Sequence, residues 1–157
     1  MSDLHDEPRL AELRALIDGW LDDFATDNPL VAAVDCGTSD GTMLAEPRWY
    51  VRLIGEEKEY ITVWLTLGQR TLRYETYVLP DPPEHRDEIL DHLMRRNDAL
   101  VGAAFSVGEE DAIYLRGQIP DTAVTDDELD RIIGTLYTTV EANFRHLVRR
   151  AFASKFV

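Results

Sequence analysis

The chain has 157 residues and a formal net charge of -14, with 30 acidic and 16 basic side chains. This length fits a single domain, residues 1–157. So acidic a chain repels a phosphate backbone, and we expect no nucleic-acid partner. Cys36 is the only cysteine, which excludes an internal disulfide and suits a reducing compartment. The start "MSDLHDEPRL" lacks the features of a signal peptide and no apolar run approaches bilayer length, so we expect a cytoplasmic protein without membrane contact.

A first helix is predicted by apolar residues at spacings of three and four, which form one stripe. The stripe consists of Leu10, Leu13, Leu16, Ile17, Trp20, Leu21 and Phe24. The segment "TDNP" ends this helix. Residues 26–47 have two interpretations. Within them "LVAAVDCG" is either a short extra strand or part of an irregular connection, and "SDGTM" contains an Asp-Gly turn signal.

Three strands follow in quick succession. They are "RWYVRLI" (48–54), "YITVWLTL" (60–67) and "TLRYETYVL" (71–79). The links "GEEKE" and "GQR" between them are so short that they predict an antiparallel meander, with "GEEKE" as a charged turn.

The second half of the chain predicts a helix, a hairpin and a long last helix. Residues 84–96 place apolar side chains on one helical face and are followed by Asn97, and "FSVGEEDAIYLRG" (105–117) has the pattern of a β-hairpin. Thr125 and Glu128 form a predicted capping box at the start of the last helix. Its apolar stripe, from Leu129 to Phe152, covers about seven turns, more than the width of a five-stranded sheet. The stripe therefore either extends beyond the domain or is covered by other parts of the same chain.

The order of these elements resembles a known bacterial family. The runs "RWYVRLIGEEKEYITVWLTLGQRTLRYETYVLP", "LMRRND", "AFSVGEEDAIYLRGQIP" and "VTDDELDRIIGTLY" resemble YbjN-type domains, a family of sensory transduction regulators, and especially their actinobacterial branch. The resemblance covers about residues 48–152 and leaves out 26–47 and Cys36. It implies an α+β fold like that of the small, usually dimeric type III secretion chaperones, with a five-stranded antiparallel sheet in the order α-β-β-β-α-β-β-α. It implies no catalytic motif.

The hairpin has a physical purpose in such a fold. Three strands leave an open edge and too little area for the amphipathic helices, and two more strands widen the sheet. The face that the helices cover is expected to carry Val51, Leu53, Ile61, Val63, Leu65, Leu67, Leu72, Val78, Phe105, Val107, Ile113 and Leu115.

The opposite face of the sheet carries the candidate binding residues. By the period of two they are Tyr50, Arg52, Tyr60, Trp64, Arg73, Tyr77, Tyr114 and Arg116, together with Glu75. Aromatic residues and arginines are enriched at protein interfaces. The same residues could instead form cross-strand pairs that only stabilise a solvated sheet.

Catalytic and metal sites are poorly supported by the sequence. His85, Glu88 and His92 share a helix face, but the two histidines are about 10 Å apart, too far to bind one metal ion together. A lone cysteine such as Cys36 is usually a small buried hydrophobe, and "DCGTSDG" lacks the lysine of a phosphate loop. We therefore expect no catalytic residue, no metal and no cofactor.

Two functional classes remain. The first is a non-enzymatic regulator or chaperone-like module, a homodimer that binds an unidentified protein or peptide by sheet-edge pairing or apolar grooves. The second is an enzyme or a small-ligand binder that holds an acidic compound through Arg52, Arg73 and Arg116. A broad flat interface supports the first class, and a deep pocket supports the second.

Overall fold

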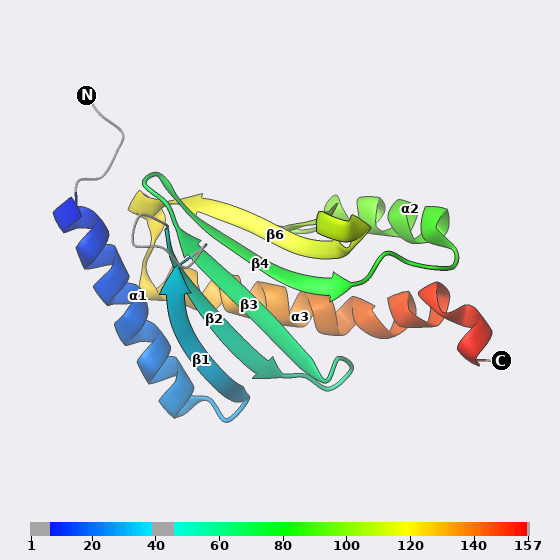
Figure 1. The fold of residues 1–157 in the computed structure, drawn as a ribbon, viewed down its shortest axis with the longest axis horizontal. Helices are drawn as coiled ribbons and strands as arrows, with labels where there is room; N and C mark the ends of the chain where they lie inside the picture. Colours follow the sequence, from blue (N-terminus) through cyan, green and yellow to red (C-terminus); the bar gives the residue numbers. More distant parts are fainter. Residues whose placement is uncertain (1–6, 39–45, 157) are drawn as a thin grey trace.

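The structure is a computed structural model that describes residues 7–38 and 46–156, and Figure 1 shows their arrangement. In chain order the elements are α1 (Glu7–Asp27), β1 (Val31–Thr38), β2 (Pro47–Ile54), β3 (Tyr60–Leu67), β4 (Thr71–Leu79), α2 (Arg86–Asn97), β5 (Ala104–Val107), β6 (Ile113–Pro120) and α3 (Asp126–Ala151). The strands of the described ranges form one antiparallel sheet in the order β1-β2-β3-β4-β6-β5. The predicted α+β class is confirmed. No helix in the described ranges is long and apolar enough to cross a membrane.

The sheet has six strands, so the prediction of five was wrong. The additional strand is β1, which lies in the segment that had two interpretations and pairs with the outer edge of β2. Its residues Ala32, Ala33 and Gly37 are small and its apolar alternation is weak, so the local pattern does not distinguish a strand from a connection. The cross-strand partners, such as Trp49 opposite Cys36, give this segment its register. The Asp-Gly turn signal at 40–41 lies outside the described residues.

The predicted hairpin is confirmed and widens the sheet as expected. Its second strand, β6, pairs with the edge of β4, and β5 becomes the outer strand. The strand β5 pairs with β6, and it is also hydrogen-bonded to the side chain of Asn97 at the end of α2. The Nδ2 atom of Asn97 donates to the carbonyl oxygen of Phe105 at 3.1 Å, and the Phe105 amide donates to Oδ1 of Asn97 at 2.7 Å.

The core lies between the sheet and the helices. Eleven of the twelve side chains predicted for the covered face are buried. Val107 is the exception at 44% exposure, because it is the last residue of the outer strand β5. The same face also buries Trp49, whose Nε1 donates to Oδ1 of Asp18 on α1 at 2.7 Å, and Tyr74, whose hydroxyl donates to the Gly102 carbonyl at 2.5 Å.

The apolar stripe of α3 is covered by its own chain. Its buried residues extend from Leu129 to Ala151, and the helix contacts β3, β4, α1 and α2. The predicted capping box is only half formed. The Thr125 hydroxyl accepts a hydrogen bond from the Glu128 amide at 3.2 Å, but the Glu128 carboxylate pairs with Arg131 at 2.7 Å and not with the cap.

The charged turn between β2 and β3 is anchored to α3. The Glu141 carboxylate on that helix accepts hydrogen bonds from three successive backbone amides, those of Glu56 and Glu57 at 2.9 Å and that of Lys58 at 3.2 Å. Tyr137, one turn earlier, donates its hydroxyl to the Ile54 carbonyl at 2.9 Å. These contacts hold one end of the sheet firmly against the longest helix.

Candidate functional site

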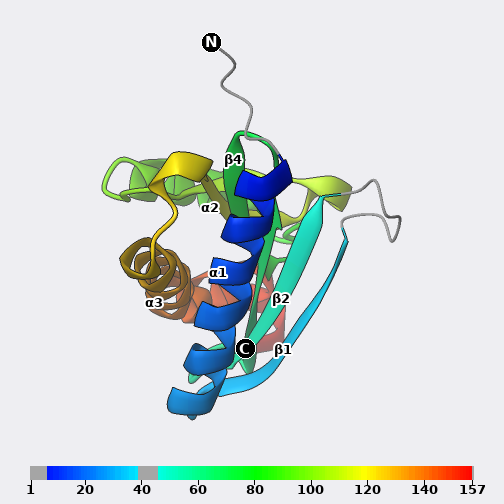
Figure 2. The same cartoon turned by 90° about the vertical axis from the view of Figure 1, so that its left-hand side faces the viewer.

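One face of the sheet is not covered by any helix of the described ranges, and we call it the open face. Figure 2 shows α2 and α3 together on the other side of the strands. Arg73 is exposed on the open face. The other seven predicted binding residues are half-buried there, namely Tyr50, Arg52, Tyr60, Trp64, Tyr77, Tyr114 and Arg116. The structure therefore places all eight side chains on one surface.

Aromatic side chains on the open face form two edge-to-face pairs across neighbouring strands. Tyr50 and Trp64 are directly opposite in the β2–β3 register, and their ring centroids are 6.2 Å apart. Tyr77 and Tyr114 are opposite in the β4–β6 register, with centroids 5.6 Å apart. Such pairs fix the rings in one orientation. The open face thus presents rigid aromatic surface at two places.

Three arginines of the open face lie on aromatic rings. The guanidinium carbon of Arg52 is 3.9 Å from the centre of the Tyr60 ring, and that of Arg116 is 4.1 Å from the centre of Tyr114. Arg48 lies 5.6 Å from the Trp64 ring. Stacking on a ring limits the motion of a guanidinium group while its N–H donors remain available at the edge.

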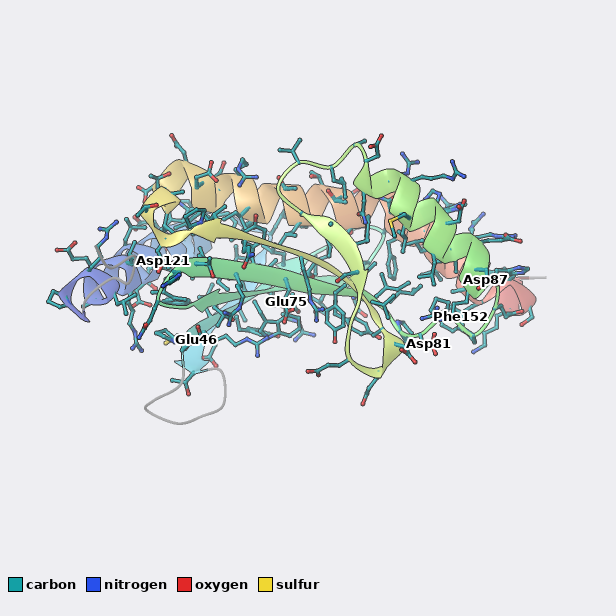
Figure 3. The ribbon with its side chains drawn as sticks, turned by 90° about the horizontal axis from the view of Figure 1, so that it is seen from above. Glu46, Glu75, Asp81, Asp87, Asp121 and Phe152 are labelled. Carbon is teal, nitrogen blue, oxygen red and sulfur yellow. The ribbon has the colours of Figure 1, made fainter. Side chains whose placement is uncertain are left out.

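Two glutamates hold three of the arginines. The Glu75 carboxylate on β4 accepts from Nη2 of Arg48 at 3.2 Å and from Nε of Arg116 at 2.7 Å, so it bridges β2 and β6. Glu46 accepts from Nη2 of Arg73 at 2.6 Å. Both labelled glutamates lie on the side of the sheet away from α3 (Figure 3). Sequence reasoning missed Arg48, although the period of two places it on the same face as Tyr50.

The arginines surround a hollow on the open face. Its volume is about 490 Å³, and Arg48, Arg73 and Arg116 line it together with Trp64 and Glu75. A volume of this size lies in the range of ligand sites. The sequence analysis left a flat interface and a pocket open, because strand periodicity does not show where long side chains leave space between them.

A second, apolar hollow lies between α2 and the outer strand β5. Its volume is about 170 Å³, and its lining includes Leu90, Met94, Phe105 and Val107. Met94 is 72% exposed, and Val101, in the following loop, is 78% exposed. The sequence analysis assigned Val107 to the core and did not identify this surface.

Burial changes the titration of two groups near the end of the open face. It raises the pKa of the Tyr77 phenol, and the neighbouring Tyr114 and Glu110 raise it further. Burial also lowers the pKa of the Lys58 ammonium group, which donates to the Tyr60 carbonyl at 3.1 Å. Tyr77 therefore offers a neutral hydroxyl group to a partner at physiological pH.

His85, just before α2, and His92 within it do not form a metal site with Glu88. Glu88 pairs with Arg150 of α3, and Nδ1 of His85 lies 3.7 Å from its carboxylate. His92 packs on His146 of α3, with ring centroids 4.6 Å apart. The described residues contain no group of three His, Cys, Asp or Glu side chains arranged to hold a metal ion.

Cys36 is exposed, so its expected role as a small buried hydrophobe was wrong. It lies on β1, the outer strand next to β2. Its backbone amide donates to the side chain of the neighbouring Asp35 at 2.8 Å. The apolar run before Cys36 misled the prediction because most of β1 is itself exposed.

Several mycobacterial proteins are similar to this chain. The uncharacterized proteins Rv0487 of Mycobacterium tuberculosis and Mb0497 of Mycobacterium bovis are each 36% identical over 110 residues, which is 70% of this chain and 60% of each relative. The uncharacterized protein ML2442 of Mycobacterium leprae is 29% identical over 118 residues, 75% of this chain and 62% of that protein. The matched region thus spans about three fifths of these relatives.

Two solved structures are also similar. A chain of the crystal structure of the ExsC–ExsE complex has a TM-score of 0.59 and 19% identity, and the match covers 85% of this chain and 94% of that one. The type III secretion chaperone SycH of Yersinia pestis, solved with a stable fragment of YscM2, has a TM-score of 0.47 and 14% identity, over 78% and 94% of the two chains. The first likeness shows a shared fold, and the second is too distant to support an argument.

The model of the YbjN family, described as "Putative bacterial sensory transduction regulator", matches residues 36–149. The match includes every strand from β2 to β6, and therefore all of the open face. It begins at Cys36, earlier than the resemblance at residues 48–152 predicted. The match covers more than half of the chain. The chain belongs to the YbjN family.

Proposed function

We propose that this chain is a non-enzymatic, protein-binding regulator with a chaperone-like role, and that it holds a segment of a partner polypeptide against the open face. The observation that carries the proposal is the gathering of half-buried Tyr, Trp and Arg side chains on a sheet face without a helical cover. These residue types provide much contact area at a small cost in side-chain entropy, and they dominate binding energy at interfaces.

The composition of the open face exceeds what sheet stability requires. Cross-strand pairs contribute about 0.2 to 1 kcal/mol each, and ordinary residues can provide this. Here the arginines gather on one face of a chain with net charge -14, and they surround a hollow instead of filling it. One fold serves many functions, so the proposal rests on this surface and not on the likeness to other folds.

A small acidic compound is the second candidate ligand. It is favoured by the hollow of about 490 Å³, in which Arg48, Arg73 and Arg116 converge. Of the three arginines expected for this role, Arg73 and Arg116 line the hollow, whereas Arg52 lies on the Tyr60 ring. We rank this function second because the half-buried aromatic and arginine side chains of the open face extend well beyond the lining of the hollow, over a larger area than a small compound would contact.

We also propose that the chain, as a single domain, works as a homodimer in the cytoplasm. The exposed apolar side chains Met94 and Val107 beside the hollow between α2 and β5 support a contact between two copies there. Light scattering between 1 and 100 µM should show twice the monomer mass for the wild type. The Met94→Glu variant should show a lower average mass, because the charge weakens the contact between the two copies. A strict monomer at the highest concentration would contradict the dimer without affecting the open face.

The test of partner binding uses variants of the open face. Affinity capture from the native host should recover a partner with the wild type and lose it with Trp64→Ala combined with Arg73→Ala. Arg95→Ala, an exposed arginine on α2, is the control for charge. The interaction should then be measured with the purified partner, because capture alone does not establish a direct contact. If the double variant binds the purified partner as tightly as the wild type, the open face is not the binding surface.

A further inference from the structure

The hollow of the open face is a positively charged site on a strongly acidic protein. Three arginines and one glutamate are the charged groups in its lining, while the whole chain carries a net charge of -14. An acidic segment of another polypeptide is repelled by most of this molecule and attracted here. Charge complementarity therefore identifies the chemistry that this site would hold.

The arginines have more donors than the chain itself uses. A guanidinium group presents five N–H donors in a fixed plane. Arg48 gives one donor to Glu75 through Nη2, and Arg116 gives another through Nε. The planar fork of an arginine matches a carboxylate, which can accept two parallel hydrogen bonds. The donors that remain can hydrogen-bond a second carboxylate in addition to Glu75.

Glu46 does not line the hollow, but it already pairs with Arg73, one of the arginines that do. It lies just before β2, outside the sheet, and its carboxylate takes the Nη2 donor of Arg73 at 2.6 Å. Both side chains are well exposed, 49% for Arg73 and 39% for Glu46. An exposed ion pair of this kind contributes little stability. A carboxylate from another chain can therefore replace Glu46 at Arg73 at small cost.

We propose that the hollow is a receptor for acidic side chains of a partner polypeptide, and that Glu46 competes with them for Arg73. This inference rests on the proposed function and names the chemistry of its partner. Trp64 forms one wall of the hollow and gives the residue next to the bound acid an aromatic surface. The hollow opens onto an uncovered sheet face, where an extended chain can pass across it.

The test measures binding of a synthetic hexapeptide of four glutamates and two phenylalanines to the full chain at constant ionic strength, by titration calorimetry. Its control is the same peptide with glutamine at each acidic position. The acidic peptide should bind at least about tenfold more tightly, which corresponds to about 1.4 kcal/mol. Arg73→Ala and Arg116→Ala should each weaken binding about five- to tenfold, and Glu46→Gln should strengthen it about three- to tenfold.

Matched variants separate the hollow from the general charge of the face. Arg52→Ala removes a positive charge from the same face, but Arg52 is stacked on Tyr60 and does not line the hollow, so the affinity should change less than twofold. If Arg116→Ala does not fold, Arg116→Lys is the substitute. It keeps the positive charge but lacks the planar donors of the guanidinium group, so it should still weaken binding.

Three results would overturn the inference. They are equal binding of the two peptides, an unchanged affinity in the Arg73 and Arg116 variants, and inorganic phosphate binding as tightly as the acidic peptide. In the last case the hollow is a general oxyanion site. A failure of the proposed function would give a different result. A purified partner would then bind the variant with both Trp64→Ala and Arg73→Ala as tightly as it binds the wild type, independently of the peptide affinities.

Discussion

Gly117 and Gly134 should respond in opposite ways to the same added methyl group. A Cβ at Gly117 on β6 would lie 2.2 Å from the carbonyl oxygen of Gly102 and 2.4 Å from the ring of Tyr74, so backbone would have to move. Gly134 is exposed on α3, and a Cβ there would meet nothing within 4 Å.

We expect Gly117→Ala to lower the free energy of unfolding by about 1 to 3 kcal/mol. Gly134→Ala should raise it by about 0.5 to 1 kcal/mol, because alanine restricts the unfolded chain and favours the helix. Urea unfolding of both variants measures the two changes. If Gly117→Ala were as stable as the wild type, β6 would not approach Gly102 as closely as the structure shows.

His92 should make folding sensitive to acid. Burial lowers its pKa below the usual histidine value of about 6.5, and His146 and Arg96 lower it further, while Asn143 and Asp91 act in the opposite direction. As the pH falls through about 6.5, the unfolded chain binds a proton that the folded chain does not yet bind. The free energy of unfolding therefore decreases from this pH downward until the folded state also protonates.

His92→Gln should remove part of this loss. Chemical unfolding at several pH values between 7.5 and 5 should give a shallower decrease for His92→Gln than for the wild type. His146→Gln should give an intermediate slope, because His146 is only a secondary cause of the lowered pKa. An identical slope in the wild type and His92→Gln would contradict the assignment.

Local periodicity predicted well where side chains point and poorly what they touch. The period of two placed Tyr50, Trp64 and Arg116 on the open face. It could not show that Arg48 and Arg116 share Glu75, because these residues are brought together by pairing across β2, β3, β4 and β6. The role of Glu46 was also hidden, because this residue precedes its strand.

At the scale of elements, one side chain of α2 hydrogen-bonds the backbone of the outer strand β5. Asn97 makes both a donor and an acceptor contact with the backbone of Phe105, at 3.1 and 2.7 Å. This four-residue strand pairs with one neighbour in the described ranges, β6. The sequence analysis identified Asn97 only as the residue that follows the predicted helix, and its contact with β5 was not foreseen.

We expect Asn97→Ala to cost about 1 to 2 kcal/mol of stability and to accelerate amide hydrogen exchange in residues 104–107. Asn97→Asp is the matched variant. It keeps the acceptor for the Phe105 amide but loses the donor and places a carboxylate beside a carbonyl oxygen. Both variants should show the effect, while exchange in β2 and β3 stays unchanged. Equal exchange rates in wild type and variants would show that α2 does not hold β5.

The elements differ in how far their sequence specifies them. The long stripe of α3 predicted a helix, and Thr125 marks its start in the structure as expected. The strand β1 was uncertain because alanine and glycine bury little area, so its pairing with β2 decides its conformation. The covering of the α3 stripe by α2 depends on tertiary packing that no local pattern contains.

At the scale of the whole molecule, two electrostatic effects oppose each other. Ion pairs such as Arg73–Glu46 and Arg95–Asp91 stabilise the fold, but their side chains are largely exposed, so each contributes little. The excess of 14 negative charges acts over the entire surface and destabilises the compact state by self-repulsion. Salt weakens both effects, since it screens charges beyond about 10 Å at 0.1 M. The sign of the salt dependence therefore tells which effect is larger.

We expect the repulsion to be larger at pH 7.5. Raising NaCl from 20 to 300 mM should increase Tm by about 2 to 4 °C, the change that about 1 kcal/mol gives in a chain of this size. Scanning calorimetry at pH 7.5 and at pH 5 provides the control, because the net charge becomes small near the isoelectric point of about 4.5 and the salt effect should shrink with it. A fall of Tm with salt at pH 7.5 would instead show that the arginine–glutamate pairs outweigh the repulsion between the acidic groups.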